Sequence, residues 1–307
     1  MCFLLTEQWR AYRNQDGSRR KQKALPLSVL RKMMEVSTTE WDIATSWLLI
    51  GGLFFAMRSC EYLQTSADES SKRTKILRLK NIQFTSKGRR IPHDSPNLEE
   101  SDMVAINFEF QKNDRRDVQI HLFRTDDKIL CPVKAWAATV KRVRSYPNQH
   151  DNLTVCTFQE KDGSLTQIVA EHVRIRLRAI VDLIGEEALG FGRDDIGLHS
   201  IRSGGAMAMF LSGTSTIVIR RIGRWSSEAF LEYIREQVED FTAGVAQRML
   251  KFEKFHNLQQ NQHTLPMHIE REDKEDGPEQ IPFTIQFSDL ALERDEELPQ
   301  RRRRGHG

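Results

Sequence analysis

Apolar residues near the start of the chain predict two helices. Residues 26–36 (PLSVLRKMMEV) form a short one. Ser37 and Glu40, in the STTEW that follows, stand at the spacing of a capping box. In that motif a hydroxyl and a carboxylate three residues apart bond backbone N–H groups at the start of a helix. We therefore expect a second helix to begin here, contain the apolar run WLLIGGLFFAM at 47–57 and continue to about Tyr62.

The next part of the chain has the two-residue period of β-strands. Residues 76–84 (ILRLKNIQF) are strand-like, and the polar residues 85–102 are expected to form a loop. VAINFEF at 104–110 alternates between apolar and polar residues, and VQIHLF at 118–123 alternates again. Because the turn-forming KNDRRD separates them, the two segments predict a β-hairpin. The apolar side chains expected on one face of the first strand are Val104, Ile106, Phe108 and Phe110.

Helical patterns dominate the second half. CPVKAWAATVKRV at 131–143 has Pro132 near its first turn, where proline is favoured. HVRIRLRAIVDLIG at 172–185 ends in Gly185, a suitable stop. Its apolar stripe consists of Val173, Leu177, Ile180, Val181 and Ile184. Further helices are expected at 199–213, 215–222, 227–236 and about 238–255. The predicted fold class is therefore α+β, mainly helical, with a small antiparallel sheet.

Charge is distributed unevenly along the chain. The formal net charge is +3, but residues 258–307 carry 11 acidic and 7 basic side chains, so residues 1–257 hold the positive excess. That excess permits a nucleic-acid partner without requiring one. Because residues 258–307 are polar, charged and aperiodic, we expect a disordered tail there. Its RRRR at 301–304 is either a nuclear-import or phosphate-binding patch or a solvated run of charge.

The same pattern argues against membrane and disulfide-rich proteins. The longest apolar run has 11 residues, whereas a membrane-spanning helix needs about 20. No secretory signal opens the sequence, so we expect no membrane partner. The four cysteines show no paired spacing typical of metal ligands, and we expect neither disulfide bonds nor a zinc site. They are Cys2, Cys60, Cys131 and Cys156.

LHSIRSGGAM at 198–207 raises the question of chemistry. His199 and Arg202 are three residues apart, so they share one face of a helix, as a phosphate site requires. Alone this pair proves little, because a half-buried histidine is usually structural. Six further residues could join it, and they are Arg58, Glu61, Lys112, Arg224, Trp225 and Tyr233.

Each of these residues also has a plainer interpretation. Arg58 could serve as a cation at the C-terminus of its helix, where positive charge is favourable. Lys112 lies where the first predicted hairpin strand enters its turn, and such a lysine is commonly solvent-exposed. Trp225 and Tyr233, in IGRWSSEAFLEYIR at 222–235, fit an amphipathic helix as core residues. It is their combination that favours a shared function.

In order and spacing, the set resembles the residues of the tyrosine recombinase, or phage-integrase, family. The resemblance covers about residues 25–257, and GRWSSEAFLEYIR is most similar to the recombinases of crypton-type eukaryotic mobile elements. It implies a recombinase catalytic domain whose hairpin carries the lysine, between a short basic segment at 1–24 and the tail at 258–307. It also implies double-stranded DNA as substrate and a homotetramer on two duplexes. For a eukaryotic element it implies a nuclear location, and otherwise a cytoplasmic one.

The resemblance implies DNA breaking and rejoining through a covalent intermediate. Tyr233 would attack the scissile phosphate, form a 3′-phosphotyrosyl link and release a 5′-hydroxyl. Arg58 and Arg202 would clamp the phosphate, a task that suits the planar and permanently charged guanidinium. The covalent link conserves the energy of the phosphodiester bond. Neither ATP, a metal nor another cofactor is then needed.

Proton transfer and support would come from the remaining residues. His199 would assist proton transfer, and Lys112 would protonate the departing oxygen. Glu61 would buttress Arg58. The position nine residues before the nucleophile, usually His or Trp in the family, is Arg224, whereas Trp225 comes one residue later. Either could donate to the phosphate, and the spacing favours Arg224.

Family members usually carry a helical DNA-binding domain ahead of the catalytic one. Residues 1–24 are basic but too short to form it. Two other functions therefore stay open. One is a truncated or domesticated module that binds DNA without productive catalysis, and the other is a type IB topoisomerase, which shares the chemistry. The compact run from His199 to Tyr233 favours a recombinase, because nuclear topoisomerases insert a long linker before their tyrosine.

Overall fold

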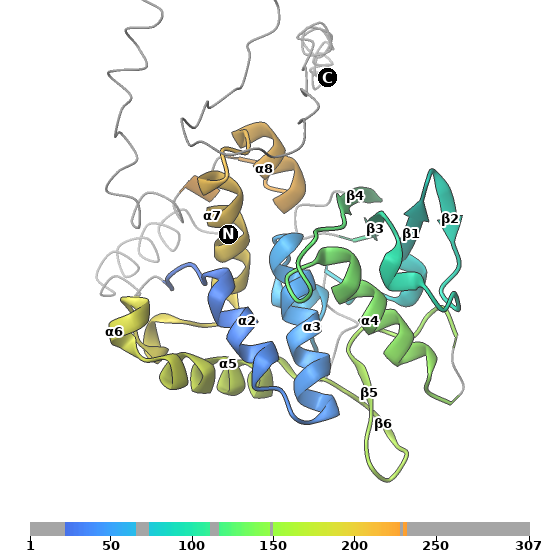
Figure 1. Cartoon of the computed structure of the whole chain (residues 1–307), viewed down its shortest axis with the longest axis horizontal. Helices are drawn as coiled ribbons and strands as arrows, with labels where there is room; N and C mark the ends of the chain where they lie inside the picture. The colour runs from blue at the N-terminus through green and yellow to red at the C-terminus, as the bar shows by residue number, and fades with distance from the viewer. Residues whose placement is uncertain (1–21, 66–73, 111–116, 148–149, 228–229, 232–307) are drawn as a thin grey trace, which may run out of the picture. The chain divides into compact units, whose positions relative to one another are not determined.

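The computed structural model describes residues 22–65, 74–110, 117–147, 150–227 and 230–231 (Figure 1). The helices are α2 (Leu27–Glu35), α3 (Glu40–Phe54), α4 (Pro132–Arg144), α5 (Ala170–Ile184), α6 (Glu186–Leu189), α7 (His199–Leu211) and α8 (Thr216–Gly223). Short 3-10 helices are η1 (Ser59–Glu61), η2 (Leu79–Asn81), η3 (Leu98–Glu100) and η4 (Arg193–Asp195). With a four-stranded antiparallel sheet and a small hairpin, these elements confirm the predicted α+β, mainly helical class. The helices expected beyond residue 231, the tail at 258–307 and the segment at 1–21 lie outside the described residues.

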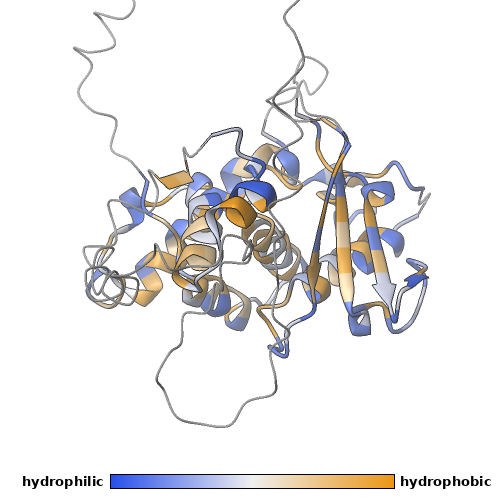
Figure 2. Cartoon of the chain, turned by 90° about the horizontal axis from the view of Figure 1, so that it is seen from above, coloured by the Kyte–Doolittle hydropathy of each residue, from blue (hydrophilic) through white to orange (hydrophobic). Residues whose placement is uncertain are grey.

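The larger sheet has the order β2-β1-β3-β4. Its strands are β1 (Ile82–Ser86), β2 (Arg89–Ile91), β3 (Met103–Phe108) and β4 (Val118–Phe123). β3 and β4 pair antiparallel from Met103 opposite Phe123 to Phe108 opposite Val118, which confirms the predicted hairpin. Figure 2 shows apolar and polar residues alternating in bands along these strands. The apolar face is buried against the helical core, and its members include Ile82, Phe84, Val104, Ile106, Phe108 and Ile120.

The expected elements in this region need three corrections. Within 76–84, only the part from Ile82 onward is a strand, because Leu79–Asn81 form a 3-10 turn closed by the Asn81 side chain on the Arg78 N–H. The expected loop at 85–102 contains β2, which folds back on β1. Phe110, expected on the apolar face, lies beyond the end of β3 and is 41% exposed.

The structure contains a second hairpin that was not predicted from the sequence. β5 (Thr157–Gln159) and β6 (Leu165–Gln167) pair antiparallel. Gly163 has a φ of +86° in the turn between them, a conformation that glycine adopts without strain. The Asp162-Gly163 pair is a strong turn signal and marks this hairpin in the sequence.

The second helix begins later and ends earlier than expected. Thr39, not Ser37, is its N-cap, because the Thr39 hydroxyl accepts from the Asp42 N–H and the Asp42 carboxylate accepts from the Thr39 N–H. Ser37 instead closes the preceding helix by donating to the Met33 carbonyl. The helix ends at Phe54, and Ala56 turns the chain with a φ of +42°. The residues that follow are thereby free to form a separate turn.

Helix α3 is the centre of the core, with α2, α4 and α7 packed around it (Figure 1). It is apolar on nearly all sides, which is the pattern of a buried helix. The other predicted helices agree with the structure: α4 has Pro132 in its first turn, and α5 ends at Gly185, whose φ is +93°. Four residues of the predicted α5 stripe are buried and Ile184 is partly buried.

Two glycines let α7 approach its neighbours backbone to backbone. A Cβ on Gly204 would lie 2.2 Å from the Leu25 carbonyl oxygen, and one on Gly205 would lie 2.2 Å from that of Leu53. No side chain fits at such distances, so the small residues of SGGAM are required by packing. The contact of Gly205 with the end of α3 brings the first turn of α7 beside the segment that follows α3.

Gly205→Ala is expected to destabilise the protein by about 3 kcal/mol, because the added methyl group meets rigid backbone. Helix propensity alone favours alanine by about 1 kcal/mol, so the sign of the change is diagnostic. Chemical denaturation measures it. The matched control is Gly192→Ala, whose Cβ meets only the end of the Glu186 side chain at 3.0 Å and should cost less than about 1 kcal/mol. Equal losses in the two variants would contradict the packing argument.

Candidate functional site

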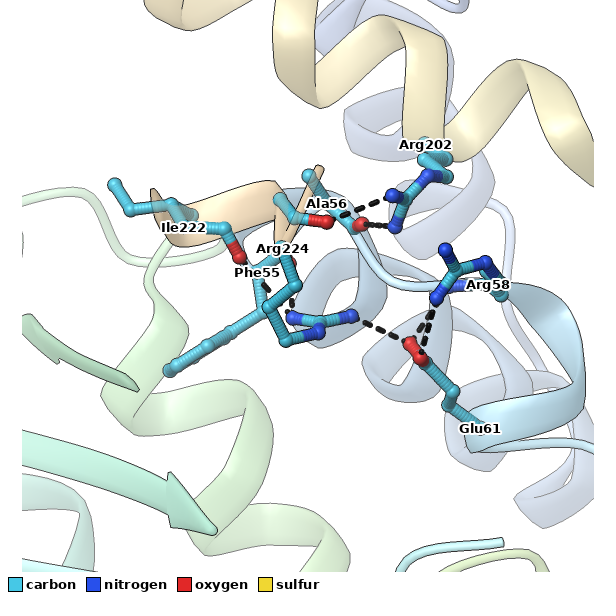
Figure 3. A network of polar contacts seen from close by, with 8 residues as sticks. Phe55, Ala56, Arg58, Glu61, Arg202, Ile222 and Arg224 are labelled. Carbon is cyan, nitrogen blue, oxygen red and sulfur yellow. Dashed lines mark hydrogen bonds and ion pairs between the residues drawn. The ribbon is translucent and has the colours of Figure 1, made fainter. Parts of the chain in front are cut away.

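Three segments that are distant in sequence meet at one cluster of arginines (Figure 3). The turn after α3 supplies Arg58 and Glu61, the first turn of α7 supplies Arg202, and the residue after α8 is Arg224. Arg58 has extended backbone and precedes η1, so it does not cap a helix C-terminus. We call these four residues the arginine cluster.

Glu61 joins two of the arginines through its two carboxylate oxygens. Its Oε1 accepts from Arg58 Nη1 at 3.3 Å. Its Oε2 accepts from Arg224 Nη2 at 2.6 Å and from the Arg58 backbone N–H at 2.8 Å. The Glu61 side chain is only 2% exposed, so these bonds replace water around a buried charge.

Arg224 is almost fully buried, with 2% of the residue exposed. Its Nη1 donates to the carbonyl oxygens of Phe55 at 3.2 Å and Ile222 at 3.1 Å, and its guanidinium carbon lies 3.6 Å from the centre of the Phe108 ring. Burial lowers the pKa of this guanidinium; Glu61 raises it and Arg58 lowers it further. A guanidinium nevertheless keeps its charge in proteins. Phe108 was not predicted as a site residue, because the alternation of apolar and polar residues in its strand indicates only a core position.

Arg202 ties the cluster to the backbone. It donates from Nη1 to the Ala56 carbonyl and from Nη2 to the Gly223 carbonyl, the latter at 2.7 Å. Its guanidinium carbon lies 4.2 Å from the centre of the Trp225 ring, within the range of a cation–π contact. Arg202 is 2% exposed and Trp225 is 8% exposed. Through these contacts, Arg202 and Trp225 connect the turn after α3 to the end of α8.

His199 is the first residue of α7; the residue is exposed, although neighbouring atoms partly desolvate its imidazole. Burial lowers the pKa of its imidazole, and the charges of Arg202 and Arg58 lower it further. The imidazole is therefore neutral at pH 7 and can accept a proton. An anion placed between the arginines would offset their effect and raise this pKa.

The arginine cluster carries more positive than negative charge. Its members are three arginines and one carboxylate, an excess of two positive charges, and Figure 3 shows Glu61 bonded by Arg58 and Arg224 while Arg202 bonds backbone carbonyls. Arg224 and Glu61 are almost fully buried, whereas the Arg58 side chain is 24% exposed. The positive charge of the cluster attracts anions, and Arg58 is its most accessible arginine.

The structure brings six of the eight residues singled out by sequence into this region, namely Arg58, Glu61, His199, Arg202, Arg224 and Trp225. Lys112 and Tyr233 lie outside the described residues. Residues close to each in sequence do contact the site. Phe108, four residues before Lys112, lies under Arg224, and Phe230, three before Tyr233, lies 5.6 Å from Trp225 between ring centres.

The two tyrosines within the described ranges are placed elsewhere. The Tyr62 ring is fully buried against Gly52 of α3, and burial together with Glu61 raises the pKa of its phenol. Tyr146 lies beyond the C-terminus of α4, and its hydroxyl accepts a hydrogen bond from Arg142 in the last turn of that helix. Neither phenol is offered to an anion at the arginine cluster.

Within the described residues, no group of three or more His, Cys, Asp or Glu side chains could hold a metal ion. In that part of the chain no helix is both long and apolar enough to cross a membrane.

Comparison with known proteins gives matches among solved structures only. No family model and no curated protein matches the chain. The XerH site-specific recombinase bound to difH substrate matches over 71% of this chain and 51% of its own, with 16% identity and a TM-score of 0.44. Its post-cleavage complex with palindromic difH covers 76% and 56%, with 16% identity and a TM-score of 0.45.

The Tn1549 transposon integrase in complex with a circular intermediate DNA covers 76% of this chain and 68% of its own, with 13% identity and a TM-score of 0.44. The chain thus spans about half the length of the XerH chains it matches. These matches are structures of a site-specific recombinase and a transposon integrase.

Proposed function

We propose that this chain is a tyrosine recombinase that breaks and rejoins DNA through a covalent 3′-phosphotyrosyl intermediate. The observation that carries the proposal is the arginine cluster, with its excess of two positive charges and a neutral imidazole beside it. A phosphodiester is a monoanion, and further negative charge develops on its oxygens in the transition state of cleavage. Guanidinium groups bond two of its oxygens at once and retain their charge throughout the reaction.

Preorganised positive charge accelerates the cleavage step. As the tyrosine oxygen attacks, negative charge builds on the non-bridging oxygens of the phosphate, and fixed cations stabilise it most strongly in the transition state. Arg58, the most exposed arginine of the cluster, contacts the phosphate in this proposal. Arg202 is buried and contributes its positive charge from within the cluster. Its direct contact with the phosphate stays a prediction.

Proton transfer assigns roles to His199, Lys112 and Tyr233. A tyrosine has a pKa near 10 in water, so at neutral pH its hydroxyl must lose a proton as it attacks. The neutral imidazole of His199 accepts that proton, and the phosphate bound next to it makes the imidazole more basic. Lys112 then protonates the leaving 5′-oxygen. Attack by that hydroxyl, or by one from another strand, reverses the link and completes rejoining.

The test is covalent capture on DNA. The full chain is incubated with a nicked duplex from which the released fragment diffuses away, and the products are separated under denaturing conditions. A protein–DNA adduct formed without metal or ATP supports the proposal. Salt-sensitive DNA binding with no adduct would instead support a recombinase-derived module that binds DNA without catalysis.

The partners of the reaction follow from the same proposal. Exchange between two duplexes needs four cleavages, so we infer that four copies of the chain assemble on DNA. We also infer a nuclear location if the chain comes from a eukaryotic mobile element, and otherwise a cytoplasmic one. Relaxation of supercoiled plasmid by the monomer would favour a type IB topoisomerase over a recombinase.

Acidification is expected to slow adduct formation. Protonation of His199 removes the acceptor for the tyrosine proton, and its pKa is lowered, so the rate should be constant near neutrality and fall only below about pH 6.5. Stability falls over the same range, because the unfolded chain binds this proton more readily than the folded one. Initial rates at subsaturating DNA measure the effect.

His199→Gln is the matching variant. It should be slower at every pH and lack the acid limb that begins below about pH 6.5. An unchanged acid limb in the variant would assign the titration to another group.

A further inference from the structure

Glu61 is bonded unequally by its two arginines. The contact with Arg224 is 2.6 Å long and almost fully buried, whereas the contact with the Arg58 guanidinium is 3.3 Å long and partly exposed. The Arg58 backbone N–H supplies a third bond to the same carboxylate at 2.8 Å. Glu61 is thus held mainly by Arg224 and the backbone.

This inequality leaves the Arg58 guanidinium free to move. A carboxylate that is 2% exposed needs a compensating charge at all times. Because Arg224 supplies that charge, Arg58 can turn its fork toward another anion without leaving Glu61 unpaired. If Arg58 were the sole partner of Glu61, binding of a phosphate would have to compete with a buried ion pair.

The surroundings of Arg224 fix it in this task. Its guanidinium also bonds the carbonyls of Phe55 and Ile222 and lies over the ring of Phe108, the last residue of β3. Its own backbone is in the left-handed region, with a φ of +58°, which directs the side chain back into the core. To reach a phosphate outside, Arg224 would have to break all of these contacts.

We propose that Arg224 is a positioning residue that neutralises Glu61 and thereby releases the Arg58 guanidinium to the phosphate, and that Arg224 does not contact the phosphate itself. This inference rests on the proposed function and differs from the donor role that its place nine residues before Tyr233 suggests. Its contact with Phe108 also couples the arginine cluster to the strand that leads toward Lys112.

A positioning role and a phosphate-binding role of Arg224 predict opposite outcomes when the charges of Arg224 and Glu61 are both removed. Arg224→Gln alone leaves Glu61 to Arg58, which is drawn away from the phosphate. Adding Glu61→Gln removes the buried negative charge, so Arg58 is released and phosphate binding returns. If Arg224 were a phosphate ligand, the second change could not restore what the first had removed.

The experiment compares the full chain with Arg224→Gln, Glu61→Gln and the double variant. One readout is the rate of adduct formation on the nicked duplex, and the other is the rise in melting temperature caused by inorganic phosphate. We expect Arg224→Gln to lose about tenfold in rate and most of the phosphate-induced rise. The double variant should regain both, with a coupling of about tenfold, as is usual for residues in one network.

A double variant as slow as Arg224→Gln, with no phosphate-induced rise, would overturn the inference. Arg224→Lys guards against a variant that fails to fold. A lysine keeps a charge next to Glu61, so the phosphate-induced rise should persist, and its loss in a folded Arg224→Lys protein would also overturn the inference.

The phosphate readout separates this inference from the proposed function. If the wild-type chain forms no adduct, recombinase activity fails, yet the four melting curves still report whether Arg224 releases Arg58. A wild-type chain that does not respond to phosphate overturns the inference together with the phosphate site.

Discussion

Tyr233→Phe is expected to abolish covalent attachment of the chain to a nicked duplex. Loss of the nucleophile removes the only atom that forms the bond to phosphorus in this account, so the adduct rate should fall by roughly 10⁴-fold or more. DNA affinity should stay close to that of the wild-type chain, because the phenol contributes little to binding. Denaturing electrophoresis and a binding titration on the same substrate separate the two effects.

Tyr146→Phe is the control for this variant. Tyr146 accepts a hydrogen bond from Arg142 beyond the end of α4 and takes no part in the arginine cluster, so its loss should leave the adduct rate unchanged. An adduct that persists in Tyr233→Phe and disappears in Tyr146→Phe would show that the nucleophile is misassigned.

Arg58→Ala has the second-largest expected effect. Removing a preorganised donor to the developing charge typically costs about 3–4 kcal/mol of transition-state stabilisation, which corresponds to a loss of several hundred-fold in rate. Arg58→Lys retains the charge but loses the planar fork, so its rate should lie between those of Arg58→Ala and the wild type. Single-turnover kinetics of adduct formation measure both variants.

Arg31→Ala controls for the loss of an arginine as such. Arg31 is partly exposed and pairs with Asp127 at 2.6 Å, away from the arginine cluster. Its replacement should change neither the adduct rate nor the DNA affinity appreciably. If Arg58→Ala stayed within a few-fold of Arg31→Ala, the phosphate would have to be bound elsewhere.

Much of the fold was predictable because its elements have strong local patterns. The alternation at 104–110 and 118–123 specified the β3–β4 hairpin, and the apolar stripe with Gly185 specified α5. Boundaries were less predictable where two residues compete for one role. Both Ser37 and Thr39 offer a hydroxyl; in the structure Thr39 caps the helix, whereas Ser37 bonds the Met33 carbonyl.

The site was predictable in composition but not in its internal connections. Order and spacing selected Arg58, Glu61, His199 and Arg202 as one group. Spacing alone could not show that Arg224 shares the carboxylate of Glu61, because that contact joins residues 163 positions apart. Nor could it show that Phe108, a core residue by its alternation, supports the guanidinium.

In the proposed reaction a DNA phosphate enters the arginine cluster and is attacked by the phenol of Tyr233. Mass spectrometry of the trapped adduct, after proteolysis and nuclease digestion, identifies the linked residue. We expect a single nucleotide-bearing peptide, with the 3′-phosphate linked to Tyr233. A link to any other residue, or an intact and DNA-bound chain with no link at all, would contradict it.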